Sequence, residues 1–202
     1  MNKKISLFVV VMLPVKFLLA QEVAVMSAAQ PTIPNKSDQI IMHKTSNPLP
    51  ENVRKNLADQ LTKTLGTILD LRYQVRMAHW NIKGAGFIGL HLLFDQMAME
   101  LDGFIDQVAE RVVILGGTAL GRVQDASENS VLEKYPSDVF ADQDHVKTLI
   151  NRFSTYVKHL NEGSKFAGKL EDSVTFDLYT MLSGAAQKRL WFLESSLPVA
   201  TK

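Results

Sequence analysis

A long apolar periodicity at helical spacing constrains this chain more than any other feature of its sequence. In four stretches, apolar side chains recur every three or four residues, which places them on one face of an α-helix. Gly84 interrupts the pattern after the first stretch, Gly116 and Gly117 end the second, and Pro198 follows the last. The predicted helices cover residues 51–81, 87–115, 142–167 and 172–196. The sequence therefore predicts an all-α fold.

The connections between these helices indicate how the helices are arranged. The first and last connections are short, whereas a polar segment of residues 118–140 separates the second helix from the third. Within that segment we expect one short helical turn, around residues 128–134. One long crossover between two short loops is typical of the ferritin-like four-helix bundle. With 202 residues, 46% of them hydrophobic, the chain has enough material for one such core.

The first fifty residues differ in composition from the rest. Residues 1–20 combine Lys3 and Lys4 with an apolar run, which predicts a secretory signal peptide or, because Met26 opens a more ordinary start, an over-extended N-terminus. Residues 21–50 contain four of the seven prolines and no sustained apolar period, so we expect a flexible arm there. The bundle domain is assigned to residues 51–197.

Charge and cysteine content exclude several classes of site. The formal net charge is +1, and it becomes −2 if residues 1–20 are removed, so the overall balance gives no indication of a nucleic-acid partner. The chain has no cysteine, which excludes disulfides, thiolate metal sites and a cysteine nucleophile. Any metal must therefore be held by histidine and carboxylate side chains.

Candidate ligands of this kind gather between residues 79 and 110. Imidazole and carboxylate donors together favour iron, zinc or manganese over calcium or magnesium. The Glu-x-x-His motif, with which the usual di-iron bundle builds a centre inside one subunit, does not occur in the sequence. The other histidines, at positions 43, 145 and 159, are expected to be structural. The candidate ligands are His79, His91, Asp95, Asp106 and Glu110.

Helix geometry indicates a site formed between two chains. His91 and Asp95 lie one turn apart, as do Asp106 and Glu110, so each pair can converge on one ion. The two pairs are separated by about 16 Å along a helix that rises about 1.5 Å per residue, so they cannot meet within one chain. An antiparallel copy of the helix, related by a two-fold axis near residues 100–101, brings one pair opposite the other and forms two equivalent sites.

A continuous segment around these ligands resembles a known family. Residues 79–111 read HWNIKGAGFIGLHLLFDQMAMELDGFIDQVAER, which is similar to the signature of the Dps family, the DNA-protecting mini-ferritins of starved bacteria. The specific elements are His-Trp-Asn, then His and Asp one turn apart, then Asp and Ala-Glu-Arg, all at the spacings of that family. The likeness extends over residues 51–197 and includes Tyr135-Pro136 and the segments 143–145 and 190–194.

The resemblance implies an assembly and an activity. It implies a twelve-subunit shell with tetrahedral symmetry and two-iron ferroxidase sites at its dimer interfaces. These sites would oxidise Fe(II), with hydrogen peroxide as the expected oxidant, and the Fe(III) mineral stored in the cavity would spare DNA from oxidative damage. One subunit would supply His79, His91 and Asp95, and its two-fold partner would supply Asp106 and Glu110. Trp80 would intercept stray one-electron oxidants, unless it is an ordinary packing residue.

A second acidic group stands at the start of the last helix. Glu171, Asp172 and Asp177 occupy the place where the Dps family lines its three-fold iron-entry pores. The alternative is that these carboxylates cap the helix and complement its dipole. Both interpretations stay open at the level of the sequence.

DNA binding and location follow less directly from the resemblance. Dps proteins that bind DNA often use lysine-rich terminal arms, and this arm offers Lys36 and Lys44. The alternative function is therefore a DNA-compacting structural protein whose iron chemistry is secondary. The resemblance implies a cytoplasmic, nucleoid-associated protein without a membrane in its mature form, whereas a cleaved signal peptide would place it in the periplasm.

Overall fold

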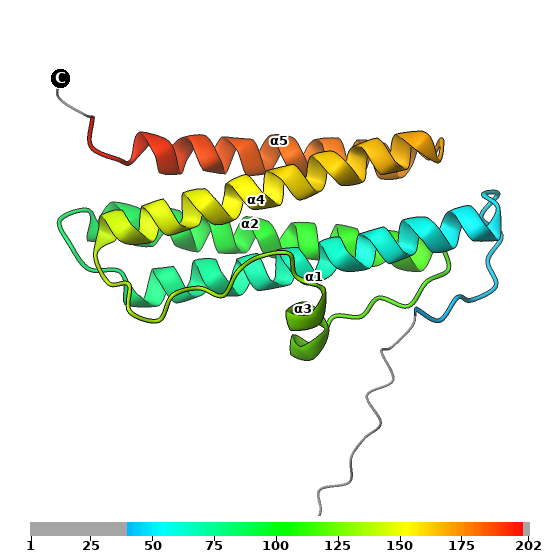
Figure 1. Cartoon of the computed structure of the whole chain (residues 1–202), viewed down its shortest axis with the longest axis horizontal. Coiled ribbons are helices and arrows are strands. Elements are labelled where there is room, and N and C mark those ends of the chain that lie inside the picture. Colours follow the sequence, from blue (N-terminus) through cyan, green and yellow to red (C-terminus); the bar gives the residue numbers. More distant parts are fainter. Residues whose placement is uncertain (1–39, 200–202) are drawn as a thin grey trace, which may run out of the picture. The chain divides into compact units, whose positions relative to one another are not determined.

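The structure of the protein, a computed structural model, describes residues 40–199, and this part is built from α-helices (Figure 1). The four long helices lie within two residues of their predicted ends, and the predicted all-α fold is confirmed for the described residues. The predicted leader at residues 1–20 lies outside the described residues. No helix within residues 40–199 is long and apolar enough to cross a membrane. The helices are α1 (Glu51–Asn81), α2 (Phe87–Ile114), α3 (Val123–Asn129), α4 (Asp142–Lys169) and α5 (Ser173–Ser195).

Two antiparallel hairpins form the bundle. The first consists of α1 and α2, the second of α4 and α5, and α1 packs against α4 while α2 packs against α5 (Figure 1). The apolar stripes predicted from the sequence face inward, because burying them removes the largest apolar area from water. Side chains that are at most 1% exposed include Leu57, Leu61, Leu65, Ile68, Phe94, Met97, Leu149 and Phe153.

Gly116 ends α2 in the way that the sequence predicts. Its φ angle of +91° lies in the left-handed region, which a residue without a Cβ adopts at little cost. The N–H of Gly116 donates to the Val113 carbonyl at 2.8 Å, and the N–H of Gly117 donates to the Val112 carbonyl at 2.9 Å. These two bonds satisfy the last carbonyls of α2 and reverse the chain, as in a Schellman motif.

Residues 40–50 belong to the predicted arm but are hydrogen-bonded to the turn that follows α2. The backbone N–H of His43 donates to the Gly116 carbonyl at 2.6 Å, and the His43 ring lies 3.0 Å from the Thr118 hydroxyl. Arg54 of α1 donates to the carbonyls of Leu49 and Leu115 at 3.0 and 2.9 Å. This segment is therefore attached to the bundle, although it contains no helix.

The crossover between α2 and α4 carries its short helix earlier than the sequence predicts. We expected helical residues around 128–134, whereas α3 spans Val123–Asn129 and packs against α1. Its first turn is fixed by Asp125, whose carboxylate accepts from the Arg122 backbone N–H at 2.8 Å and from the Arg122 side chain. The hydrogen bond from the Arg122 side chain is also the main reason that the pKa of Asp125 lies below its usual value. A polar cap, rather than an apolar period, determines where this helix begins.

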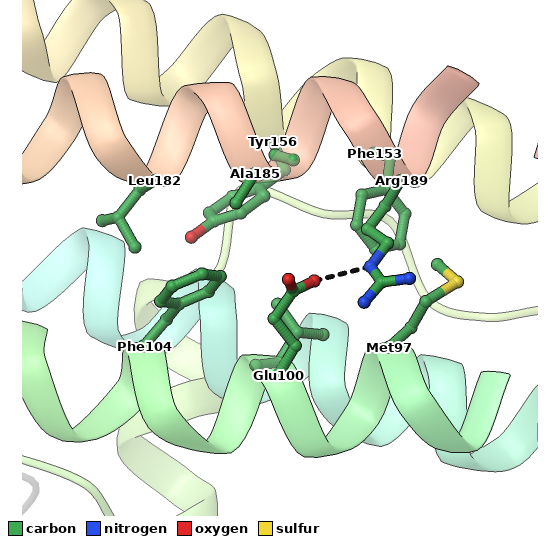
Figure 2. Close-up of a pocket in the computed structure, with 10 residues that line it drawn as sticks. Met97, Glu100, Phe104, Phe153, Tyr156, Leu182, Ala185 and Arg189 are labelled. Carbon is green, nitrogen blue, oxygen red and sulfur yellow. Dashed lines mark hydrogen bonds and ion pairs between the residues drawn. The ribbon is translucent and has the colours of Figure 1, made fainter. Parts of the chain in front are cut away.

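An ion pair connects the two hairpins in the middle of the bundle. Figure 2 shows Glu100 of α2 facing Arg189 of α5, with 2.6 Å between the carboxylate and the guanidinium. The side chains of Phe104, Leu182 and Tyr156 surround the small cavity beside this pair. This ion pair is thus one of several partnered polar groups among the apolar side chains of the bundle.

Candidate metal centre

Two of the predicted ligands, His79 and His91, lie against each other at the end of the first hairpin. His79 is near the C-terminus of α1 and His91 is in the second turn of α2, and the short loop 82–86 brings them together. Their rings are stacked, with centroids 3.7 Å apart and planes inclined by 21°. Both side chains are half-buried. The two histidines that the resemblance assigns to one subunit therefore lie together within one chain.

Each of these histidines is held by the backbone of the other. Nδ1 of His79 lies 2.9 Å from the His91 carbonyl, and Nδ1 of His91 lies 2.9 Å from the His79 carbonyl. Because a carbonyl oxygen only accepts, both Nδ1 atoms must carry a proton, and in the neutral tautomer of each ring the lone pair is then on Nε2. Metal-binding histidines are typically oriented by such a bond from the other ring nitrogen. The two Nε2 atoms are therefore in the correct tautomer to bind a metal.

The third ligand predicted for this chain, Asp95, is paired with a cation instead. Its carboxylate accepts from Nη1 of Arg76, and the two side chains are 36% and 20% exposed. Arg76 stands one turn before His79 on α1, and our sequence analysis did not identify it. The available signal was its spacing of three residues from His79, which places both side chains on one face of the helix.

The remaining two ligands, Asp106 and Glu110, are exposed on α2. Within residues 40–199 neither has a hydrogen-bond or ion-pair partner. No group of three or more His, Asp or Glu side chains in the described part of the chain is arranged to hold a metal. The structure thus brings His79 and His91 together, leaves Asp95 with Arg76, and keeps Asp106 and Glu110 apart from all three. Imidazole and carboxylate donors of this kind fit iron, but one chain alone does not assemble them.

Trp80 follows His79 and is 70% exposed. Most of the indole ring is therefore uncovered within its own subunit. Ordinary packing stays an alternative for Trp80. A role in capturing oxidants stays a prediction.

The three acidic residues near the start of α5 differ in their surroundings. Glu171 and Asp177 are exposed, whereas Asp172 is 4% exposed. The Asp172 carboxylate accepts from Arg111 at 2.7 Å and from the Thr175 hydroxyl. Burial alone would raise the pKa of Asp172, but the bonds from Thr175 and Arg111 outweigh it and leave the pKa below its usual value. This placement makes Asp172 a structural residue in the described chain, and the pore prediction stays untested at the exposed Glu171 and Asp177.

Only one of the two lysines predicted to contact DNA lies among the described residues. Lys44 is exposed on the segment before α1. Lys36 lies outside the described residues. The prediction of DNA contact therefore stays untested at both positions.

The three histidines that we expected to be structural are partnered inside the chain. His43 bonds to Thr118, the His145 ring lies 2.7 Å from the Tyr135 hydroxyl, and the His159 ring lies 2.9 Å from the Thr64 hydroxyl. Burial lowers the pKa of both His145 and His159 below the usual value. These two rings are therefore buried in their neutral form.

Comparison with known proteins identifies the family. Residues 58–199 match the model of the ferritin-like domain. The chain is 39% identical over 153 residues to the DNA protection during starvation protein of Agrobacterium fabrum, an alignment that covers 76% of this chain and 94% of that protein. A second relative, the fine tangled pili major subunit of Haemophilus ducreyi, is 28% identical over 141 residues, covering 70% of this chain and 74% of that subunit.

Solved structures agree with the sequence comparison. The Dps structure of Mycobacterium smegmatis in its tetragonal form superimposes with a TM-score of 0.75 at 27% identity, covering 79% of this chain and 96% of that one. DpsC of Streptomyces coelicolor gives a TM-score of 0.74 at 25% identity, with 79% and 95% covered. Taken together with the histidine pair and the acidic pair on α2, these likenesses show that the chain belongs to the Dps family of ferritin-like proteins.

Proposed function

We propose that this protein is a ferroxidase that binds ferrous iron at sites shared between two-fold-related subunits and stores the oxidised iron in a dodecameric cage. His79, His91 and Asp95 of one subunit and Asp106 and Glu110 of its partner hold two irons at each site. Hydrogen peroxide is the proposed oxidant. Protection of DNA from oxidative damage is the proposed consequence, as the names of several relatives indicate for those proteins.

One observation carries this proposal. Two histidines are fixed with their Nε2 lone pairs free, yet no third donor joins them in the described part of their own chain. On α2, the helix that carries His91, Asp106 and Glu110 are exposed and have no partner among residues 40–199. His91 and Glu110 are equally distant in sequence from the Glu100–Leu101 bond, and so are Asp95 and Asp106. An antiparallel two-fold copy of α2 therefore aligns the two halves of the site.

The apolar side chains on α2 support the same pairing. Ile88, Leu92 and Val113 are 67%, 56% and 56% exposed, so α2 presents large apolar side chains that its own chain leaves uncovered. A shallow groove lies beside Glu110, lined by Ala109, Val113 and other small or apolar side chains. In the two-fold arrangement, Ile88 of one subunit stands opposite Val113 of the next, and Leu92 stands opposite Ala109. A second copy would thus cover an apolar surface while it completes the metal ligands.

The chemistry of such a site follows from its stoichiometry. Two Fe(II) ions each give up one electron, and one hydrogen peroxide takes both electrons together with two protons to form two waters. Because both electrons come from neighbouring irons, the O–O bond is cleaved without releasing a hydroxyl radical. Carboxylate ligands favour Fe(III) over Fe(II), which lowers the reduction potential and drives the oxidation. Trp80, which is exposed and adjacent to the proposed ligand His79, is the proposed residue to intercept radicals that escape this reaction.

The proposal also includes an iron-entry pore and a cellular location. The exposed Glu171 and Asp177 are the proposed acidic residues of an iron-entry pore. Protection of DNA requires the compartment that contains the DNA, so the proposed location is cytoplasmic. Mass spectrometry of the native N-terminus tests the location, because cleavage of residues 1–20 would contradict it.

Iron oxidation by purified protein tests the site. Consumption of Fe(II) with hydrogen peroxide is measured for the wild type and for a variant that combines His91→Ala with Asp95→Asn. Binding of Zn²⁺, a redox-inert probe, is measured on the same samples by calorimetry. We expect loss of both properties, because the variant removes two of the three ligands that this subunit supplies to each site. Unchanged oxidation and unchanged Zn²⁺ binding would refute the assignment.

A gel-shift assay at physiological salt separates the alternative function, compaction of DNA, from the proposed one. The alternative rests on the exposed Lys44. If DNA binding is the primary role, charge reversal of Lys36 and Lys44 will abolish a strong shift and leave oxidation intact. If the ferroxidase proposal holds, the shift will be weak or absent in the wild type while iron oxidation is rapid. Multivalency in a cage is the reason to test the assembled protein.

A further inference from the structure

The Arg76–Asp95 ion pair occupies a carboxylate that the proposed function requires as a metal ligand. Arg76 is on α1 and Asp95 on α2, so the pair also connects the two helices that supply His79 and His91. Within residues 40–199, none of the other four proposed ligands forms an ion pair. Arg76 is thus the one cation in direct contact with the proposed ligand set in the described part of the chain.

We propose that Arg76 is an internal counter-ion of the metal-free site, which holds Asp95 until a divalent metal displaces it. This inference rests on the proposed inter-subunit site. It assigns to Arg76 a positioning role, since the guanidinium contacts a ligand and not the substrate.

The need for a counter-ion follows from the charges. When two subunits meet as proposed, each site gathers three carboxylates, namely Asp95 and the partner's Asp106 and Glu110. Without a metal, these like charges repel one another across a partly desolvated interface. An arginine in this position offsets part of the repulsion. The cage can then assemble before any metal arrives.

The same contact makes Arg76 a competitor of the metal. A guanidinium stays protonated at every pH at which the protein is folded, so it cannot release Asp95 by losing a proton. The metal must displace it, and Arg76 has room to move because its side chain is 20% exposed. Removal of the arginine should therefore strengthen metal binding and weaken the empty interface. A merely structural ion pair would produce only the second effect.

A matched control exists one turn away. Arg72 of α1 donates to Asp102 of α2 at 2.9 Å, with side chains 26% and 47% exposed. This second arginine pair connects the same two helices but involves no proposed ligand. Arg72→Gln therefore reproduces the loss of an arginine pair between α1 and α2 without touching the site.

The experiment compares the assembled wild type with Arg76→Gln, Arg76→Lys and Arg72→Gln. Zn²⁺ affinity is measured by calorimetry, and resistance of the metal-free assembly to urea is measured by size exclusion in the presence of a chelator. For Arg76→Gln we expect Zn²⁺ to bind more tightly by on the order of tenfold, the scale typical of residues that contact metal ligands. We also expect its metal-free assembly to dissociate at a lower urea concentration and to be restored by Zn²⁺. Arg76→Lys keeps the charge and should behave like the wild type in the metal-free assay, and Arg72→Gln should not alter Zn²⁺ affinity.

Three outcomes would overturn the inference: an unchanged Zn²⁺ affinity in Arg76→Gln, an unchanged metal-free assembly, or an equal gain of affinity in Arg72→Gln. These outcomes are distinct from a failure of the proposed function. If the proposed inter-subunit site does not exist, the wild type itself will show no Zn²⁺ binding that depends on His91. Circular dichroism of each variant verifies that its helices are formed.

Discussion

Asp172 and Asp106 are aspartates of the same bundle with opposite surroundings. Asp172 is 4% exposed and is bonded to Arg111 and Thr175, whereas Asp106 is exposed and has no partner within the described residues. Folding satisfies polar groups that it buries, because an unpaired buried charge is costly. Groups of the same chemistry that stay unsatisfied on an apolar surface are available for something outside the chain. The contrast distinguishes Asp172, a structural carboxylate, from Asp106, a candidate ligand.

The largest effect on stability is expected at the buried aspartate. Asp172→Ala leaves the Arg111 guanidinium buried without its partner, which typically costs about 3–5 kcal/mol. The exposed Asp177→Ala serves as the control, with an expected change within about 0.5 kcal/mol. Urea denaturation at a fixed protein concentration measures both. A stable Asp172→Ala protein would contradict the structural role given to this residue.

Substitution of the exposed Asp106 is expected to affect metal binding and not stability. Asp106→Asn should weaken Zn²⁺ binding by on the order of 10- to 100-fold or more, since it removes a proposed ligand, and should leave the helical content unchanged. Asp102→Asn, one turn earlier on α2, is the comparison because Asp102 pairs with Arg72 and is no proposed ligand. Calorimetric titration with Zn²⁺ distinguishes the two variants. Equal affinities would remove Asp106 from the site.

The buried histidines predict a dependence of stability on pH. Burial lowers the pKa of His159 from 6.5, so the unfolded chain takes up a proton before the folded chain does as the pH falls. The contribution of His159 to the stability of the folded protein is fully present above pH 6.5 and is lost as the pH falls towards the pKa of the folded state. The free energy of unfolding should therefore decrease below that pH, by up to about 1.4 kcal/mol per pH unit for each such group. His159→Gln should show a shallower slope in urea titrations between pH 5 and 8, and an identical slope would exclude His159 as a cause.

The smallest effect is expected at two tyrosines in the core. The Tyr156 hydroxyl is fully buried and has no hydrogen-bond partner in the described chain, whereas the Tyr179 hydroxyl lies 2.9 Å from that of Thr64. Tyr179→Phe should cost about 1 kcal/mol, and Tyr156→Phe should cost nothing or stabilise the protein slightly. The Tyr156 ring borders the small cavity beside Glu100 and Arg189 (Figure 2). A loss above about 1 kcal/mol for Tyr156→Phe would mean that an ordered water bonds to this hydroxyl.

The sequence predicts those features that depend on a repeated local pattern. The four long helices follow from their apolar period, and the turn at Gly116 follows from the need for a positive φ angle. The contact between His79 and His91 follows from the short loop between the helices that carry them. Each of these features is decided by residues close together in the chain.

Features that depend on contacts between distant residues were missed or misplaced. Arg76 reaches Asp95 across two helices, and no local pattern marks it as part of the site. In the sequence Asp172 looks like an exposed acidic residue, but in the structure it is buried in an ion pair with Arg111 of α2. The start of α3 is set by the polar contact of Asp125 with Arg122, and its seven residues are too few for an apolar period.

The sharing of the site between subunits can be tested by complementation. One variant lacks His79 and His91, and a second carries Asp106→Asn with Glu110→Gln, so each alone should be inactive in iron oxidation and Zn²⁺ binding. In a mixed two-fold dimer, one of the two sites receives all its ligands from the intact halves of the two chains. Co-assembly of equal amounts should therefore restore about one quarter of the wild-type sites. A mixture that stays as inactive as its components would contradict a site shared between subunits.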